Sequence, residues 1–196
     1  MNKQLLSVFT ILILFFFNNN LSAESTADTG SASGTNIIYT FNGEDEIKEF
    51  AQLAQMKMAV INKMSVLENY IVLEKNNLDE VNGQLLLKYK IDPVKNYSLD
   101  ANTKKIFENS PDVSNSEKKT EKSVYDFASD DDMKNFVNMI QVKQSVLNRI
   151  TILQEYLISE KNNFDRVNGQ LILKFKIDPA KNYSLDSEKK VIIENK

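Results

Sequence analysis

The chain has 196 residues, of which 42% are hydrophobic and 26% charged, and its formal net charge is −3. These values are ordinary for a soluble protein with a core, and they give no basic field that would attract nucleic acid or anionic lipid. The sequence has no Cys, His or Trp. It therefore lacks thiol nucleophiles and the histidines on which many metal sites and general bases depend.

Residues 1–23 have the layout of a secretory signal peptide. Lys3 gives a positive start, an apolar run of 13 residues covers 5–17, and a polar stretch ends in a small residue, Ala23. As a helix the run would be about 20 Å long, short of the roughly 30 Å bilayer core, so a retained membrane anchor is the weaker alternative. Residues 24–36, rich in Ser, Ala, Thr and Gly, predict a flexible leader. We expect a periplasmic or extracellular protein with no membrane span after cleavage.

The rest of the chain is an internal repeat. Residues 39–109 align without a gap with 125–195, and 37 of these 71 positions are identical. Identity is concentrated in 74–100, where it reaches 22 of 27 positions. We therefore predict repeat 1 over 37–109 and repeat 2 over 124–196. The polar, charged segment 110–123 with its single Pro predicts a linker.

Each repeat should begin with one long helix, over about 44–88 and about 130–174. Both segments open with three acidic residues, which suits a helix N-terminus, and Ser129 is a good N-cap for the second. Apolar residues recur every seven positions, which is typical of a coiled coil. Pro93 and Pro179 should end the helices. The sequence leaves open whether the helices continue through polar pairs such as Asn76-Asn77 and Asn82-Gly83.

After each helix, alternating residues around a polar turn predict a short β-hairpin, over about 96–108 and about 182–194. Apolar residues before each helix are candidates for one further strand. The predicted fold class is mainly α with small β elements. It comprises two tandem repeats, each a long coiled-coil-like helix followed by a short β-hairpin, with the helices packed antiparallel. Whether the two hairpins pair with each other stays open.

Two polar exceptions in the apolar pattern indicate how the helices pair. Lys57 and Lys143 interrupt the main seam, and Glu74 and Glu160 interrupt the row beside it. Parallel packing in register would bring like charges together at a half-buried seam, which is costly. An antiparallel register places Lys57 opposite Glu160, and it also places Glu74 opposite Lys143. We predict these as register-setting pairs, with lysine side chains that reach water as the alternative.

A repeated loop carries the oxygen-rich side chains expected of an interaction loop. Its spacing does not fit an EF-hand, and turn formation explains it better than a calcium site. The candidate residues are Asp92, Asn96, Tyr97 and Asp100 with Asp178, Asn182, Tyr183 and Asp186. Tyr70 and Tyr156, with Tyr97 and Tyr183, are candidates for a sugar-stacking face, against the more usual role of packing aromatics. We predict no catalytic residue, cofactor or metal.

The leading hypothesis is an exported, non-enzymatic structural or protein-interaction protein that acts through its helix faces and β-hairpins. The first half of each helix is apolar over three rows, while one partner helix covers about two. This surplus predicts self-association or another protein's helix as partner. Neither nucleic acid nor a small-molecule substrate is indicated. The alternatives are a periplasmic holdase-type chaperone and an adhesin or ligand-binding module that uses the 92–100 loop.

Overall fold

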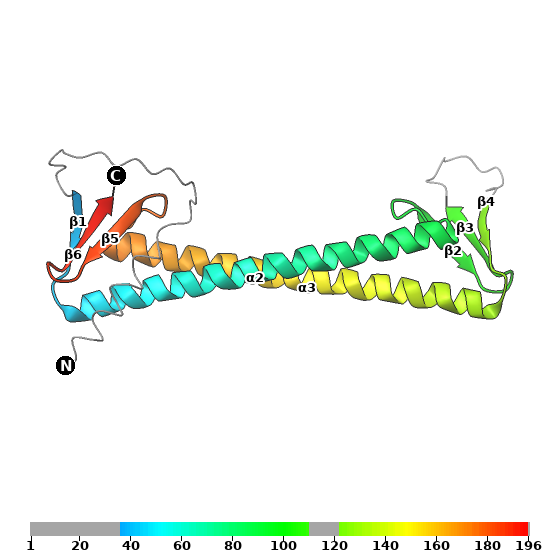
Figure 1. Ribbon diagram of the computed structural model, residues 1–196, viewed down its shortest axis with the longest axis horizontal. Coiled ribbons are helices and arrows are strands. Elements are labelled where there is room, and N and C mark those ends of the chain that lie inside the picture. Colours follow the sequence, from blue (N-terminus) through cyan, green and yellow to red (C-terminus); the bar gives the residue numbers. More distant parts are fainter. Residues whose placement is uncertain (1–35, 110–121, 196) are drawn as a thin grey trace, which may run out of the picture. The chain divides into compact units, whose positions relative to one another are not determined.

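The computed structural model describes residues 36–109 and 122–195, which form two long helices and two small sheets (Figure 1). Helix α2 spans Glu44–Tyr89 and helix α3 spans Asp130–Phe175. The strands are β1 (Asn36–Thr40), β2 (Asn96–Asp100), β3 (Lys105–Asn109), β4 (Lys122–Asp126), β5 (Asn182–Asp186) and β6 (Val191–Asn195). The predicted signal peptide, and all but the ends of the leader and the linker, lie outside the described residues. Neither helix has an apolar stretch long enough to cross a membrane.

Both helices run without a break through the polar pairs that left their continuity open. A Gly inside a helix costs about 1 kcal/mol relative to Ala. The turns that follow Gly83 are held by Leu85 and Tyr89, whose side chains are fully buried. At the start of α3, the Ser129 hydroxyl accepts a hydrogen bond from the backbone N–H of Asp132 at 3.1 Å, as an N-cap does.

The helices end before the prolines, through a left-handed residue. Lys90 and Lys176 follow directly after α2 and α3 with φ of 61° and 58°. Each donates its backbone N–H to a carbonyl four residues earlier, at 3.0 Å in both cases. Glycine is the usual residue at this position because a side chain makes the left-handed conformation costly. The cap, rather than Pro93 or Pro179, therefore fixes where each helix stops.

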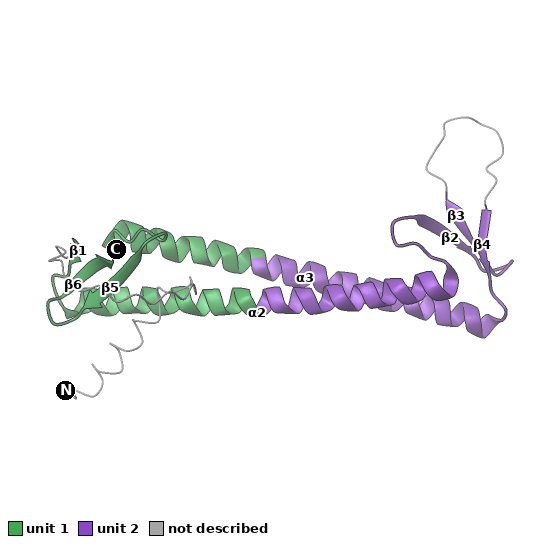
Figure 2. Cartoon of the chain, turned by 45° about the horizontal axis from the view of Figure 1, so that its top comes forward, with its two compact units in different colours: residues 1–65, 158–196 green, residues 66–157 purple. Residues whose placement is uncertain are grey.

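The described residues form two compact units, shown in different colours in Figure 2. Unit 1 contains residues 36–65 and 158–195, and unit 2 contains residues 66–109 and 122–157. Each unit thus combines the first half of one sequence repeat with the second half of the other.

Each unit has one three-stranded antiparallel sheet, ordered β1-β6-β5 in unit 1 and β2-β3-β4 in unit 2. The two hairpins therefore do not pair with each other. Instead, β1 pairs with β6, with Asn36 opposite Glu194, and β4 pairs with β3, with Asp126 opposite Lys105. The strand that precedes the helix of one repeat completes the sheet of the other repeat.

An aromatic cluster forms the centre of each core. In unit 1, Tyr39, Phe41, Phe50 and Phe175 have ring centroids 5.2–5.8 Å apart, mostly edge to face, and the last two side chains are 1% exposed. The equivalent residues of unit 2 are Tyr125, Phe127, Phe136 and Tyr89, with centroids 5.1–5.9 Å apart. Each cluster joins the segment before one helix, the first turns of that helix and the last residue of the other.

The position of Phe175 predicts a large effect of its removal. Phe175→Ala should lower the unfolding free energy by about 3–5 kcal/mol, because it leaves a cavity among three other rings. The matched control is Leu173→Ala on the same helix turn, where the side chain is 84% exposed and the expected change is within about 0.5 kcal/mol. Urea unfolding measures both. Similar losses for the two variants would contradict the assignment of the core to this cluster.

Candidate functional site

Glu74 and Glu160 each contact a cation on the opposite helix, but not the predicted one. In unit 2, the Arg149 guanidinium donates to both Glu74 carboxylate oxygens, at 2.8 and 3.0 Å. In unit 1, Lys63 Nζ lies 3.5 Å from Glu160 Oε1. The observed cations lie six residues beyond the expected lysines, Lys143 and Lys57, so the predicted pairs are replaced by pairs in another antiparallel register.

The same register brings Lys174 of α3 into contact with Glu49 of α2 within unit 1. In unit 2, Lys88 lies 3.4 Å from Asp132. The two helices are therefore antiparallel within each unit. Arg149 and Lys63 occupy equivalent positions in the two repeats, as do Glu74 and Glu160. One register therefore satisfies both glutamates.

Lys57 lies in the seam without an ion pair to any described residue and contacts an aromatic ring instead. Its ammonium lies 5.5 Å from the centroid of the Phe164 ring. Burial lowers the pKa of Lys57, since the half-buried site disfavours the charged form. The attraction of a cation for a ring face offsets part of that cost. Lys143, which is also half-buried, likewise has no ion pair among the described residues.

In the predicted interaction loop, Asp92 and Asp178 make hydrogen bonds within the loop's own turn. The Asp92 carboxylate accepts a hydrogen bond from the Val94 backbone N–H at 3.0 Å, and the Asp92 N–H donates to the Tyr97 hydroxyl at 3.0 Å. Asp178 accepts from the Ala180 N–H at 2.9 Å and donates its own N–H to Tyr183 at 3.0 Å. These are local side-chain to backbone bonds that hold a turn after a helix. The structure thus brings Asp92 to Tyr97, and Asp178 to Tyr183.

The remaining loop candidates begin and end a strand. Asn96 and Asn182 are exposed at the first position of β2 and β5. The Asp100 carboxylate accepts bonds from the Thr103 hydroxyl at 2.7 Å and from backbone N–H groups, and these bonds lower its pKa. Asp186 accepts a bond from the Lys189 backbone N–H at 2.9 Å and pairs with the Lys189 ammonium at 3.2 Å, and these contacts likewise lower its pKa. Because these carboxylates are engaged locally, the loop forms no cluster of free ligands.

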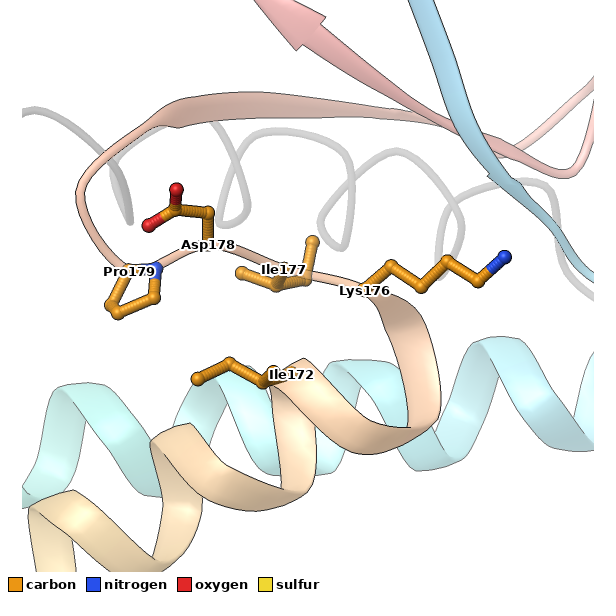
Figure 3. A pocket seen from close by; sticks show the side chains of 5 residues that line it. All are labelled: Ile172, Lys176, Ile177, Asp178 and Pro179. Atoms are coloured by element: carbon orange, nitrogen blue, oxygen red, sulfur yellow. The ribbon is translucent and has the colours of Figure 1, made fainter.

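A shallow hollow lies beside this loop in unit 1, as shown in Figure 3. Ile172 of α3 faces Ile177 and Pro179 of the loop, while Asp178 and Lys176 point away from Ile172. Its lining carries no pair of carboxylates. Within residues 36–109 and 122–195, no group of three or more Asp and Glu side chains is arranged to hold a metal ion.

The apolar rows expected to be in surplus are covered. Phe50, Leu53, Ala54 and Val60 are buried, and the other members of these rows, Ile47, Ile61 and Met64, are half-buried. The sheet and the aromatic cluster of unit 1 contribute to this cover, together with the partner helix. The first half of α2 therefore leaves no broad apolar face for a partner, contrary to expectation.

A group of exposed apolar residues lies further along the helices, in unit 2. Val66, Tyr70 and Leu73 follow one another at spacings of four and three on α2, and Ile152 and Tyr156 are spaced by four on α3. Such spacings place residues on one side of a helix. Their exposed fractions are 50–61%. We call these five residues the tyrosine face.

The two rows of the tyrosine face lie on the same side of the helix pair. Each member except Leu73 directly precedes a residue of the seam; for example, Tyr70 precedes the buried Ile71. Two antiparallel helices are related by a two-fold axis that is perpendicular to the plane containing them. This rotation exchanges the helices but keeps each side of the pair on the same side. Residues that directly precede a seam residue therefore lie on the same side of the pair in both helices. By the same geometry, Val72, which directly follows the seam residue Ile71, lies on the opposite side.

Sequence reasoning grouped Tyr70 and Tyr156 with Tyr97 and Tyr183, with packing as the more usual role, and packing is what Tyr97 and Tyr183 show. Tyr97 is half-buried and Tyr183 is 4% exposed, with both hydroxyls bonded to the loop. Val66, Leu73 and Ile152 were missed. The four-residue spacing of apolar residues just outside the seam, repeated in both copies, is the signal that points to them.

No protein-family model matches the chain, and no curated protein or solved structure is significantly similar to it. The functional interpretation therefore rests on the residues described above.

The Arg149–Glu74 pair predicts a charge-reversal effect. Arg149→Glu should destabilise the protein, because it places two carboxylates across the helix pair, and the addition of Glu74→Arg should restore part of the loss. Lys143→Glu, with no ion-pair partner among described residues, is the control and should have a smaller effect. Thermal unfolding of the four proteins measures the coupling. A double variant no more stable than Arg149→Glu would refute the observed register.

The hydrogen bonding of Asp132 predicts that the unfolding free energy depends on pH in the acid range. Its carboxylate accepts a hydrogen bond from the Tyr125 hydroxyl at 2.8 Å, and this bond is the main cause of its lowered pKa. A carboxyl whose pKa is lower in the folded state stabilises the protein above its unfolded pKa of about 4, and this contribution is lost as the pH falls through the folded value.

Tyr125→Phe should therefore flatten the fall of unfolding free energy below about pH 4. The matched control is Tyr39→Phe in unit 1. The pKa of its partner Glu46 is lowered mainly by Asn42, so this variant should retain most of the acid dependence. Urea titrations at several acidic pH values measure both. Equal flattening in the two variants would contradict the role assigned to the Tyr125 hydroxyl.

Proposed function

We propose that the protein is an exported, non-enzymatic interaction protein that docks a protein partner through the tyrosine face. The observation that carries this proposal is the grouping of five half-exposed apolar side chains on one side of two adjacent helices in unit 2. Single exposed apolar residues are normal on a protein surface, whereas grouped ones mark interaction sites. Tyrosine is also enriched among the residues that dominate binding energy at interfaces.

The chemistry around the face supports a binding role. The Arg149–Glu74 pair closes one end of the face, since Glu74 follows Tyr70 by one turn on α2 and Arg149 precedes Ile152 by one turn on the antiparallel α3. Its two charges neutralise each other. The helices beneath are held by further pairs such as Lys88–Asp132. A preformed, rigid face of this kind binds without ordering a loop, which lowers the entropy cost of association.

The export part of the proposal rests on residues 1–23 alone, and the non-enzymatic part rests on composition. With no His or Cys in the sequence, general acid–base chemistry would fall to the carboxylates. In the repeated loop, Asp92 and Asp178 accept bonds from their own turn, and Asp100 and Asp186 accept bonds from theirs.

Site-specific photo-crosslinking in the producing cells tests the proposal. A benzophenone amino acid at Tyr70 or Tyr156 should give discrete crosslinked protein species. The matched control is the same probe at Val72, which is 56% exposed on the opposite side of the pair. For an identified partner, Tyr70→Asp should weaken binding about tenfold or more, as loss of a hot-spot tyrosine does.

Absence of crosslinks at both tyrosines, or equal crosslinking at Val72, would contradict docking at this face. A smear of many proteins at Tyr70 and Val72 alike would instead favour the holdase alternative, because a holdase binds unfolded clients through whatever apolar surface it exposes.

A further inference from the structure

We propose that the partner of the tyrosine face is a second copy of this chain, docked face to face with two-fold symmetry so that two helix pairs form a four-helix arrangement. This inference rests on the docking role proposed above and names the occupant of the same surface.

The first argument is charge. At one end of the face, the Arg149–Glu74 pair is closed within one chain, with both guanidinium contacts at 3.0 Å or less. Asn77 and Ser145, which lie one turn beyond this pair on α2 and α3, are uncharged. An acidic or a basic partner therefore gains nothing from this surface, and complementary charge is what gives such partners their specificity. A second copy presents an equally uncharged face and introduces no unpaired charge.

The second argument is the pattern of the face itself. Val66 and Tyr70 on α2 correspond to Ile152 and Tyr156 on α3, 86 residues later, and the helices are antiparallel within unit 2. A half-turn about the normal to the face therefore exchanges each tyrosine with the other. Whichever in-plane two-fold axis relates two copies, apolar side chains of one copy meet apolar side chains of the other. A self-complementary patch of this sort is what an isologous interface requires.

The third argument is size. Tyrosine and aliphatic side chains that are about half exposed offer, for five residues, on the order of 400 Å² of surface per copy. Two copies would bury about twice that from these side chains, less than the roughly 1,200–2,000 Å² of stable complexes. The pairing is therefore weak and concentration-dependent, and the isolated chain is monomeric when dilute.

Sedimentation equilibrium of the whole purified chain tests the pairing. The weight-average mass should rise from one chain toward two between about 10 µM and about 1 mM, the range of weak association. A variant with Tyr70→Lys and Tyr156→Lys should remain a single chain throughout, and so should a variant with Tyr70→Glu and Tyr156→Glu. The control Val72→Lys, on the opposite side of the pair, should associate as the wild type does.

Mixing the lysine variant with the glutamate variant gives the decisive measurement. If two copies meet through these tyrosines, each charged pair now faces its opposite, and the mixture should form a one-to-one dimer although neither variant associates alone. Circular dichroism melting of each variant confirms that it is folded, as expected for exposed positions.

A wild-type mass that stays at one chain up to about 1 mM would overturn the self-pairing, and so would association that the paired lysine substitutions leave unchanged. These outcomes leave the docking role standing if crosslinking at Tyr70 captures a different protein. No association together with no crosslinked species would overturn both.

Discussion

The fold depends on an aromatic contact between the segment that precedes one helix and the last residue of the other helix. Phe41 lies just before α2, Phe50 in its second turn and Phe175 at the end of α3, and their rings touch. This contact can form only when the helices run antiparallel and their ends coincide. It also holds β1 against the hairpin of the other repeat. Once it forms, it constrains the register of the two helices in unit 1.

The elements themselves could be predicted from sequence because their signals are local. Acidic first turns, an N-capping Ser129 and the seven-residue apolar period place both helices to within a residue. The last residue of each helix was harder to predict, because the left-handed cap of α2 is Lys90, whereas glycine is the residue that usually marks such a cap. The order of the strands in each sheet could not be predicted, because it depends on contacts between the two repeats. A hairpin next to its own helix gives no sign that its third strand comes from the other copy.

The register was missed for a physical reason. Opposite charges at the edges of a helix pair give a weak and non-specific rule, since several registers bring some lysine near some glutamate. Lys57 drew the prediction because it interrupts the seam, yet it is accommodated by the ring of Phe164. The cations that pair with Glu160 and Glu74 are Lys63 and Arg149, which lie outside the apolar rows and so gave no signal. Packing of the aromatic clusters at the centre of each core fixed the register instead.

Duplication and antiparallel packing together account for the tyrosine face. Within one copy, the tyrosine face has only two or three apolar residues, too few for a binding surface. Antiparallel packing lays Val66 and Tyr70 beside the same pair from the other copy, Ile152 and Tyr156, so that two short rows become one patch in unit 2. The exchange of Leu73 for Ser159 between the copies extends the patch on α2 alone. A surface assembled from two copies of one motif, related by a half-turn, has the symmetry that a second molecule needs in order to dock on it.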